Sequence, residues 1–484
     1  MKLSSLVVRG VTAPPGIDSI DIAGLTADSR KTTPGSLFAA LSGTKADGAR
    51  YIADAVAKGA VAVLAAENAE VPEGIAVPVL RAKEPRAALA HVAAAFHGAQ
   101  PETIVAVTGT SGKTSVAEFT RQILASLGRQ AASLGTIGVV THGGAVYGTL
   151  TPPEPITLHA TLAELAREGV THVAMEASSH GLDQHRLDGV RLSAAAFTNL
   201  GRDHMDYHPT VDHYLGAKLR LFTELLQPGQ AAVVNVDGAF SREVVTAAMR
   251  RGLEVMTVGR RGALLHLGPV RMEGFAQVLN IEHLGRTGAV RLPLVGAYQV
   301  ENALTAAGLA IAAGGPVDEV LGALENLKGV PGRLEIVGEA KGGLAIVDYA
   351  HKPEALAAAL DGVRPFVTGK LICVFGCGGN RDKGKRPIMG QIASEKADVV
   401  IVTDDNPRSE VPANIRAEIL AGAKGAREVG DRAEAIRTAV ALMGKGDVVL
   451  IAGKGHETGQ IVGDKVLPFS DQEETRKALE ETRA

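Results

Sequence analysis

Residues Val107–Ser115 read VTGTSGKTS, and this stretch joins a short apolar run, TIVAVTG, to a helical pattern, KTSVAEFTRQILASLG. A strand, a glycine loop that ends in Lys-Thr, and a helix form the context that a phosphate-binding loop requires. In such a loop, backbone N–H groups and the helix N-terminus receive the phosphates, the Lys113 ammonium neutralises their charge, and the Thr114 hydroxyl ligates Mg²⁺. The alternative is a glycine turn with an exposed lysine, which the flanking strand and helix disfavour.

This loop departs from the commonest nucleotide-triphosphatase pattern. That pattern has a glycine five positions before Gly112, where this sequence has Val107. The departure excludes the commonest pattern but leaves the strand–loop–helix context intact.

Several other apolar runs stop abruptly at polar residues. They are VTHVAMEASSH, LSAAAFTNLGRDH and GQAAVVNVDG in the middle of the chain, and LAIVDYAH, KLICVFGCGG, ADVVIVTDDNPR and DVVLIAGKGHE near its end. Strands of this kind alternating with helices predict an α/β fold with mostly parallel sheets buried on both faces. Ligands of such sheets bind outside the carboxyl ends of the strands, so the polar tails are the candidate site.

Length and composition limit the possible classes of protein. A chain of 484 residues is too long for one core. The net charge of −3 and an aromatic content of 3% without Trp give no electrostatic or stacking case for nucleic acid. No apolar run approaches the ~18 residues that span a bilayer. Cys373 and Cys377 lack a second cysteine pair, so buried reduced thiols are favoured over zinc. We expect a cytoplasmic protein.

Two connecting segments that contain Gly and Pro divide the sequence into three parts. FHGAQPET (Phe96–Thr103) and KGVPGRLE (Lys328–Glu335) each lie between a helical run and a strand. The expected domains are therefore residues 1–97, 98–330 and 331–484.

The loop in its shorter form, TGTxGKT/S, resembles that of the Mur ligase and folylpolyglutamate synthetase superfamily. The resemblance extends over nearly the whole chain, because the following motifs occur in order: ADSRKTTPGSLFAAL, MEASSHGLDQHR, FTNLGRDHMDYH, HYLGAKLRLF, GRLE, VDYAHKPEAL, FGCGGNRDKGKRP, TDDNPR and AGKGHE. The set is similar to Mur ligases that add the third amino acid to UDP-N-acetylmuramoyl-L-alanyl-D-glutamate. It implies an N-terminal uridine-nucleotide-binding α/β domain, a central phosphate-loop ATPase domain and a C-terminal Rossmann-like domain that binds the amino acid.

The resemblance implies that ATP and Mg²⁺ bind at the central loop. The implied metal ligands are Thr114, Glu176, His204 and Lys218, the last as an N6-carboxylated lysine (carbamate). Taken alone, Glu176 would more often cap a helix, His204 would be structural, and Lys218 would be a surface lysine. Carbamate formation needs a neutral amine, so the site must lower the pKa of Lys218.

Further positions match the nucleotide site of the family. Arg333 is expected at the γ-phosphate and Asp348 at the ribose hydroxyls. The alternatives to these nucleotide-binding roles are structural, namely a surface ion pair and an N-terminal cap. The catalytic set is then Lys113, Glu176, His204, Lys218 and Arg333. The nucleotide-binding set is Gly109, Thr110, Ser111, Gly112, Lys113, Thr114, Ser115, Asn302 and Asp348.

Contacts to the nucleotide-linked dipeptide are also implied by the resemblance. The uridine-nucleotide site corresponds to Ser29 and the turn Gly43–Gly48. The pyrophosphate and muramoyl-peptide site corresponds to Thr151, Pro152, Ser178, Gln184 and Arg186. The sequence Thr-Pro-Pro-Glu at 151–154 replaces the usual Thr-Thr-Pro-Glu, so Pro152 has lost a side-chain donor and only backbone contacts are expected there.

The segment Asp405-Asn406-Pro407-Arg408 resembles the form that selects meso-diaminopimelate, with Arg381, Gly453 and Glu457 completing the pocket. A guanidinium can grip the distal carboxylate of this diamino acid with two hydrogen bonds, and Glu457 can hold its distal ammonium. Asn-Pro is otherwise a common turn, and L-lysine or L-ornithine stays open as the added amino acid.

The implied reaction is an ATP-dependent amide ligation through an acyl phosphate, in peptidoglycan synthesis. The expected partners are therefore small molecules, namely ATP, the UDP-linked dipeptide and a diamino acid, and the expected state is a monomer. A folylpolyglutamate synthetase would lack the DNPR and GKGHE motifs and the first domain. An inactive nucleotide-binding regulator should have lost Lys113, Glu176, His204 or Lys218, and all four are present.

Overall fold

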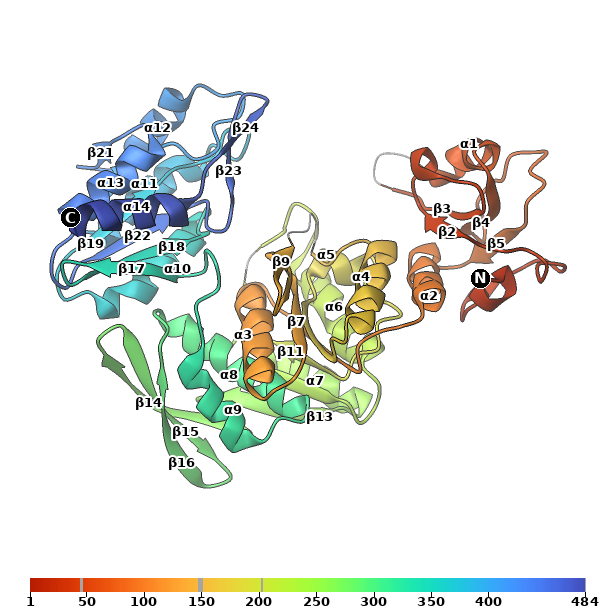
Figure 1. Cartoon of the computed structure of the whole chain (residues 1–484), viewed down its shortest axis with the longest axis horizontal. Coiled ribbons are helices and arrows are strands. Elements are labelled where there is room, and N and C mark those ends of the chain that lie inside the picture. Colours follow the sequence, from red (N-terminus) through yellow and green to blue (C-terminus); the bar gives the residue numbers. More distant parts are fainter. Residues whose placement is uncertain (44–46, 147–150, 202, 484) are drawn as a thin grey trace. The chain divides into compact units, whose positions relative to one another are not determined.

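The computed structural model of the protein describes residues 1–43, 47–146, 151–201 and 203–483 (Figure 1). The chain divides into two compact units. Unit 1 is Met1–Leu264 with Thr305–Val320, and unit 2 is Leu265–Leu304 with Leu321–Ala484. The helices α8 (Ala297–Ala312) and α9 (Val317–Ala323) each contain residues of both units. Within the described ranges, no helix is long and apolar enough to span a bilayer.

Unit 1 begins with a small sheet whose strand order is β1-β5-β4-β3-β2. The strands β2 to β5 run parallel, and β1 is antiparallel to β5. Alternate side chains of β3 enter different cores, because Leu37 packs with residues of α2 and Phe38 packs with residues of α1. The elements are β1 (Val11–Thr12), β2 (Gly24–Thr26), β3 (Ser36–Ala40), α1 (Ile52–Ala57), β4 (Ala60–Ala66), β5 (Val79–Ala82) and α2 (Pro85–His97).

The remainder of unit 1 contains strands in the order β13-β12-β11-β6-β10-β7-β8-β9. From β13 to β7 the neighbours run parallel, and β8 and β9 form antiparallel pairs. The strands are β6 (Thr103–Thr108), β7 (Ala131–Gly135), β8 (Gly138–Thr141), β9 (Gly144–Val146), β10 (His172–Glu176), β11 (Ala194–Phe197), β12 (Ala231–Asn235) and β13 (Glu254–Gly259). The helices are α3 (Lys113–Ser126), α4 (Pro155–Arg167), α5 (Ser179–Asp183), α6 (Val211–Arg220) and α7 (Ser241–Arg251).

The order of these strands explains why the loop after β6 is a natural ligand site. Strand β6 lies between β10 and β11, and all three are parallel. Their carboxyl ends therefore meet at one edge of the sheet, at Thr108, Glu176 and Phe197. All five residues of β10 and all four of β11 are buried, as expected for a sheet covered on both faces.

Unit 2 contains an antiparallel meander and a second parallel sheet. The meander is β14 (Leu265–Glu273), β15 (Ala276–His283) and β16 (Arg286–Leu292), which the sequence reasoning did not anticipate. The second sheet has the order β17-β18-β22-β19-β20-β21, in which β17 is antiparallel to β18 and the others run parallel. Its strands are β17 (Glu335–Ala340), β18 (Gly343–Asp348), β19 (Leu371–Phe375), β20 (Val399–Val402), β21 (Arg427–Glu428) and β22 (Val448–Ala452).

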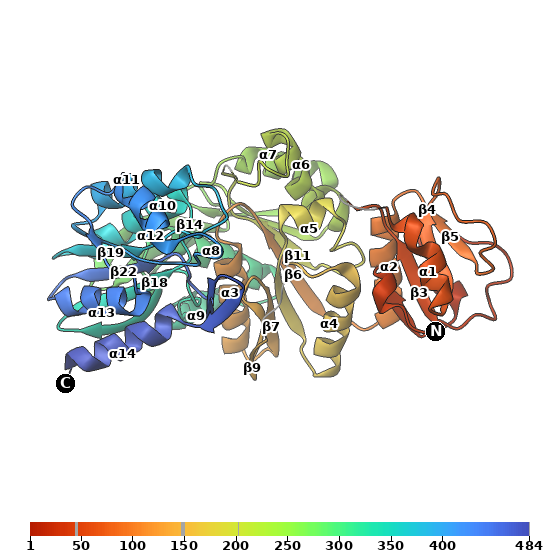
Figure 2. The same cartoon turned by 90° about the horizontal axis from the view of Figure 1, so that it is seen from above.

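Helices cover both faces of this second sheet, as Figure 2 shows. Leu344 and Ile346 of β18 pack with residues of α10, α11 and α12, whereas Ala345 and Val347 pack with residues of α13 and α14. The helices are α10 (Pro353–Val363), α11 (Lys385–Lys396), α12 (Pro412–Leu420), α13 (Arg432–Leu442) and α14 (Asp471–Arg483), and a hairpin of β23 (Gly459–Val462) and β24 (Lys465–Pro468) follows β22.

The structure confirms the α/β class, the mostly parallel sheets, and the strands predicted from the abrupt ends of apolar runs. Cys373 lies in β19, Cys377 follows it, and both are free and buried, as expected. The three-segment boundaries at residues 97 and 330 stay a prediction.

Candidate active site

The glycine loop between β6 and α3 is held against the segment that follows β11. The Thr198 hydroxyl donates to the Ser111 carbonyl at 2.7 Å, and the Ser111 N–H donates to Asn199 Oδ1 at 3.1 Å. Gly109 has φ +150° and approaches Thr198 so closely that a Cβ would overlap the Thr198 hydroxyl. Glycine is therefore required at position 109 both for its backbone angle and for the close approach.

Two lysines converge on this loop. The Lys113 ammonium donates to the carbonyls of Gly109 and Thr110, each at 2.9 Å. The Lys218 ammonium, from α6, donates to the same Gly109 carbonyl at 2.7 Å. Two lysine side chains, one from the loop and one from α6, therefore meet at the carboxyl end of β6.

Lys218 is 1% exposed, contrary to what its helical position alone would suggest. Burial lowers its pKa well below the ordinary value, the nearby charge of Lys113 lowers it further, and Asp203 opposes the shift. A lysine in such an environment has a larger neutral fraction, and a neutral amine is a nucleophile.

Glu176 ends β10, beside β6, and is 1% exposed. Its carboxylate accepts from the Thr136 N–H at 2.6 Å and from the Thr136 hydroxyl at 3.2 Å. The contacts with Thr136, which follows β7, fix the carboxylate at the edge of the sheet that carries the glycine loop.

His204 follows β11 and adopts φ +55°. Its N–H donates to Asp203 Oδ1 at 2.9 Å, and its ring centroid lies 4.8 Å from that of His180. Among the described residues, no group of three or more His, Cys, Asp or Glu side chains is arranged to hold a metal.

Tyr214 connects several of these predicted residues and was missed by the sequence reasoning. Its ring lies 4.4 Å from the Lys218 ammonium, its centroid lies 6.3 Å from that of His204, and its hydroxyl is 3.1 Å from Thr110 Oγ1. The only available signal was its spacing of four residues from Lys218 in HYLGAKLRLF, which places both on one side of a helix. Thr114 and Ser115, in the first turn of α3, are buried.

The predicted dipeptide-contacting residues also lie together. Ser178 Oγ donates to the Thr151 carbonyl at 2.8 Å, and Arg186 donates to the Pro152 carbonyl at 3.0 Å. Arg186 also donates to Gln184 Oε1 at 2.7 Å. The Pro152 carbonyl is therefore an acceptor for Arg186, and the backbone contact expected between Pro152 and the dipeptide stays a prediction.

Ser29 lies in the first part of unit 1, in the short 3-10 helix Ser29–Lys31, and is buried. Its carbonyl accepts from the Lys58 ammonium at 3.3 Å. Residues 44–46 of the predicted turn Gly43–Gly48 lie outside the described residues. Among the described residues, no hydrogen bond joins Ser29 to the glycine loop.

In unit 2, Asn302, Arg333 and Asp348 are linked by a chain of hydrogen bonds. Asn302 Nδ2 donates to Gln299 Oε1 at 3.0 Å, and Gln299 Nε2 donates to the Arg333 carbonyl at 2.9 Å. The Asp348 carboxylate accepts from the N–H groups of Leu334 and Ala350 at 2.7 and 2.8 Å. Gln299 was missed, because a polar residue in an apolar helix gives no sign of its partner.

The Asp348 carboxyl is strongly affected by its surroundings. Burial raises its pKa to about 6, although the Arg333 charge and the two backbone N–H donors act in the opposite direction. The Arg333 guanidinium lies 5.0 Å from the centre of the Tyr349 ring, a distance typical of cation–π contact.

The predicted amino-acid loop gathers at the carboxyl ends of β20 and β22. Asn406 Nδ2 donates to Glu457 Oε2 at 2.8 Å, and the Asn406 N–H donates to Asp405 Oδ1 at 2.6 Å. Gly453 has φ +121°, and a Cβ there would lie 2.7 Å from Asp405 Oδ2. Only glycine fits this position without displacing the Asp405 carboxylate.

Two arginines flank the same loop. Arg408, which follows the buried Pro407, adopts φ +53° and donates to the Gly379 carbonyl at 3.0 Å. A Cβ at Gly378 would lie 2.8 Å from Arg408 Nη1 and 3.8 Å from Arg381 Cγ, so both arginines border Gly378. Arg381 is exposed and Arg408 is partly buried. Arg408 Nη1 also donates to the Asn406 carbonyl at 3.4 Å, so its guanidinium lies beside the residue that contacts Glu457.

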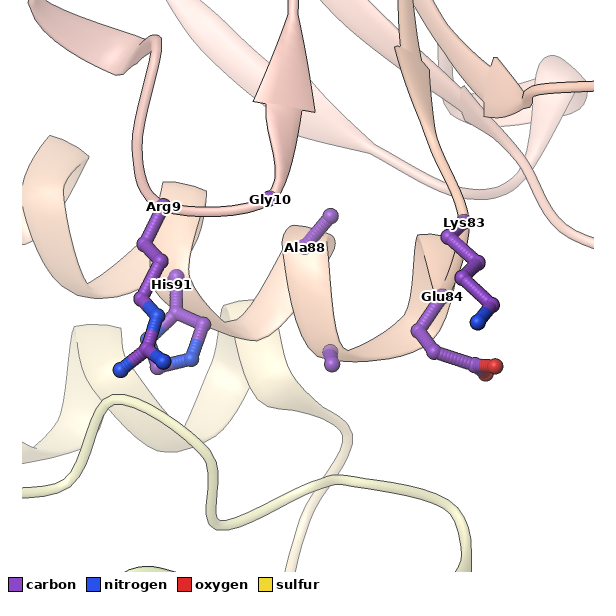
Figure 3. Close-up of a pocket in the computed structure, with 7 residues that line it drawn as sticks. Arg9, Gly10, Lys83, Glu84, Ala88 and His91 are labelled. Carbon is purple, nitrogen blue, oxygen red and sulfur yellow. The ribbon is translucent and has the colours of Figure 1, made fainter.

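A pocket of about 280 Å³ lies beside α2 in the first part of unit 1 (Figure 3). It is lined by Arg9, Gly10, Lys83, Glu84, Ala87, Ala88 and His91. None of the predicted site residues lines it, so this pocket is not the candidate active site.

Comparisons with known families place three domains along the chain. Residues 21–97 match the Mur ligase family catalytic domain, residues 107–310 the Mur ligase middle domain, and residues 332–455 the glutamate ligase domain of Mur ligases. These matches agree with the three-domain architecture expected from the sequence.

Individual relatives resemble the chain over its full length. It is 58% identical over 483 residues to a UDP-N-acetylmuramoyl-L-alanyl-D-glutamate–2,6-diaminopimelate ligase of Bradyrhizobium diazoefficiens, with 99% of each chain covered. It is 55% identical to the ligase of the same name from Caulobacter vibrioides, again with 99% of each covered. A solved structure of a ligase of that name is 31% identical, with a TM-score of 0.76 and 100% of both chains covered.

A solved folylpolyglutamate synthase of Mycobacterium tuberculosis shares the fold with a TM-score of 0.61 at 19% identity. That match covers 76% of this chain and 92% of the synthase. About a quarter of the chain therefore has no counterpart there.

Proposed function

The chain belongs to the Mur ligase family, and on that premise we infer that it adds meso-diaminopimelate to UDP-N-acetylmuramoyl-L-alanyl-D-glutamate with consumption of ATP. It is then an ADP-forming amide ligase of peptidoglycan synthesis. The observation that carries this inference is the convergence of Lys113 and Lys218 on the Gly109 carbonyl, at the loop where a transferred phosphoryl group would lie.

The reaction proceeds in two steps. A γ-carboxylate oxygen of D-glutamate attacks the γ-phosphorus of ATP, which forms an acyl phosphate and releases ADP. The amine of diaminopimelate then attacks the acyl carbon, loses a proton and expels phosphate, which leaves an amide. Little covalent chemistry falls to the protein, so its contribution is positioning and electrostatic stabilisation.

We assign the first step to the loop and its lysine. The N–H groups of residues 109–115 and the N-terminus of α3 would cradle the phosphates, and Lys113 would exchange its two carbonyl acceptors for phosphate oxygens. By the resemblance to the family, we further propose that Arg333 neutralises γ-phosphate charge and that Asn302 and Asp348 contact the nucleoside.

A divalent cation, when bound, supplies positive charge that stabilises the phosphate oxygens. Thr114, Glu176, His204 and a carbamate of Lys218 would hold it. Two observations support a cation at these residues. The Glu176 carboxylate is buried at the end of β10, beside the loop, and the pKa of Lys218 is lowered. A neutral Lys218 amine would add to carbon dioxide and lose a proton, which yields the carbamate.

The choice of amino acid rests with the loop that contains Asn406 and Arg408. Arg408 would bind the distal carboxylate of diaminopimelate, and Glu457 would bind its distal ammonium. Arg381, Asp405, Pro407 and Gly453 would shape the same pocket. L-lysine and L-ornithine have no distal carboxylate, so they would leave a guanidinium without its anionic partner.

The dipeptide would be held by residues 151–186 and the uridine nucleotide by the region of Ser29. Ser178, Gln184 and Arg186 already form one hydrogen-bonded group with the carbonyls of Thr151 and Pro152. We further propose that the protein is a cytoplasmic monomer whose domains meet at residues 97 and 330.

The test is incubation of the purified protein with ATP, the UDP-linked dipeptide and one diamino acid at a time. We expect phosphate release and a product mass increased by one amino acid residue, with meso-diaminopimelate preferred over lysine and ornithine. Phosphate release without the dipeptide would contradict a coupled ligase. Equal or better turnover with lysine or ornithine would contradict the choice of amino acid.

A further inference from the structure

Lys454 is a buried cation in the motif AGKGHE that no part of the proposed mechanism uses. Its side chain is 0% exposed, and it is among the largest fully buried side chains of the described residues. Lysines are almost never fully buried unless they are paired. The pairing of Lys454 therefore indicates what it does.

The Lys454 ammonium has two partners, both in the predicted amino-acid pocket. It donates to Asn406 Oδ1 at 3.1 Å and to Glu457 Oε2 at 3.0 Å. Asn406 Nδ2 donates to the same Glu457 oxygen at 2.8 Å. The three side chains therefore form a closed triangle of hydrogen bonds.

The triangle fixes the orientation of the Asn406 amide. Its oxygen accepts from Lys454 and, at 2.9 Å, from the Ile461 N–H, while its nitrogen donates to Glu457. If the amide were flipped, its NH₂ group would face the Lys454 ammonium and the Ile461 N–H, which are both donors. One Glu457 oxygen, Oε2, thus carries both side-chain contacts, and within the described residues no hydrogen bond to Oε1 is found.

The same contacts keep Glu457 ionised. Burial by itself raises the pKa of Glu457, but the Lys454 charge and the hydrogen bonds from Asn406 and Lys454 bring the pKa below its ordinary value. His456, beside Glu457 in the loop, also lowers it. Among the described residues, Tyr349, after β18, and Arg432, of α13, also interact electrostatically with Glu457.

We propose that Lys454 is a positioning residue for the incoming diamino acid: it holds the Glu457 carboxylate and the Asn406 amide in place so that Glu457 Oε1 binds the distal ammonium. The inference rests on the proposed function, because it takes a diamino acid as the ligand of this pocket. Lys454 acts through Glu457, since its own ammonium is fully buried and already engaged by Asn406 and Glu457.

Removal of the Lys454 charge has a specific consequence. Burial would still raise the pKa of Glu457. The Lys454 charge, which is the largest influence that lowers this pKa, would be gone. The carboxylate would then take up a proton closer to neutral pH, and a neutral carboxyl attracts an ammonium only weakly. Binding of the diamino acid should therefore acquire a pH dependence from Glu457 near neutral pH that the wild type lacks.

The experiment compares Lys454→Met, which has a similar length and no charge, with Lys465→Met on the exposed strand β24. In Lys454→Met we expect the KM for meso-diaminopimelate at pH 8 to rise by about tenfold or more, because a charged hydrogen-bond partner is lost. The KM values for ATP and the dipeptide should stay within about twofold of the wild type, as should all three in Lys465→Met.

The pH profile separates this role from a purely structural one. Between pH 8 and pH 6, the ratio of kcat/KM for meso-diaminopimelate in Lys454→Met to that in the wild type should fall further. The ratio cancels the titration of the diamino acid itself. A ratio that does not change with pH, or an equal rise of all three KM values, would overturn the proposal.

A second variant keeps the test valid if Lys454→Met does not fold, which melting by circular dichroism would reveal. Lys454→Met combined with Glu457→Gln removes the unpaired carboxylate together with its cation. Its KM for meso-diaminopimelate should equal that of Glu457→Gln alone within about twofold, because Lys454 acts through Glu457. A much higher KM in the double variant would overturn the proposal.

These measurements also distinguish a failure of the proposed function from a failure of the role of Lys454. A wild-type protein without turnover of meso-diaminopimelate would refute the proposed function. Wild-type turnover together with an unaltered KM in Lys454→Met would refute the role of Lys454 alone.

Discussion

Lys113 and Lys218 donate hydrogen bonds to the same acceptor, the carbonyl oxygen of Gly109, at 2.9 and 2.7 Å. One lysine belongs to the glycine loop and the other to α6, more than a hundred residues later in the chain. Two ammonium groups at one carbonyl repel each other, and the nearby Lys113 charge lowers the pKa of Lys218. The arrangement therefore produces one lysine suited to phosphate and one whose amine is more readily neutral.

Lys113→Ala should abolish turnover, because no other side chain of the loop can neutralise phosphate charge. We expect kcat to fall by about a hundredfold or more, as for the loss of an electrostatic contact in a phosphoryl-transfer site. Phosphate release measures the effect, and the exposed Lys477→Ala serves as the control. Normal activity in Lys113→Ala would remove the loop from the mechanism.

Lys218→Ala should lose most activity and regain part of it when small carboxylates such as acetate or formate are added. The physical reason is that a free carboxylate can occupy the volume of the lost side chain and replace a carbamate oxygen. Activity is measured against carboxylate concentration, with chloride at equal ionic strength for comparison. Full activity of Lys218→Ala without any addition would show that the carbamate is not needed.

Tyr214→Phe tests the contact between Tyr214 and the glycine loop. The change removes the hydroxyl that lies 3.1 Å from Thr110 Oγ1 and keeps the ring beside Lys218. Since one neutral hydrogen bond is lost, we expect the KM for ATP to rise by roughly two- to tenfold. Tyr214→Leu, which also removes the ring, should impair turnover more. Equal kinetics of Tyr214→Phe and the wild type would show that the hydroxyl does not position the loop.

Arg408→Ala should weaken the binding of meso-diaminopimelate far more than the binding of ATP. Loss of a charged, bidentate partner of the distal carboxylate predicts a KM increase on the order of a hundredfold. The KM for ATP should change by no more than about twofold, as should all constants in the exposed Arg427→Ala. A similar increase of the KM for ATP and of the KM for the diamino acid would place Arg408 outside the amino-acid pocket.

Asp348→Asn should change how stability depends on pH. The folded protein raises the pKa of Asp348 to about 6 from the ordinary 3.8, so between these values the folded state holds a proton that the unfolded state has lost. Wild-type stability therefore falls as pH rises from about 4 to about 6. Asparagine does not titrate, so the melting temperature of Asp348→Asn minus that of the wild type should increase over this range and then level off. A difference that is constant with pH would contradict the raised pKa.

The positions of the ligand loops could be predicted from the sequence because apolar runs in parallel sheets end abruptly. β6, β10 and β11 were predicted from their runs, and the polar residues after them, such as Glu176, lie at the sheet edge as expected. The meander β14–β16 was not anticipated. Its strands mix exposed and buried positions, so they lack the continuous apolar runs that identified the others.

The sequence by itself determined the α/β class, the strand–loop–helix context of Gly109–Lys113 and the order of the motifs, since these depend on neighbours in the chain. Only the tertiary structure decided that Lys218 and Lys454 are buried, that Tyr214 contacts Thr110, and that Gln299 connects Asn302 to Arg333. The physical reason is that the pKa and the hydrogen bonding of a side chain depend on what packs around it. For Lys218 that environment includes Gly109, which is 109 residues away in sequence.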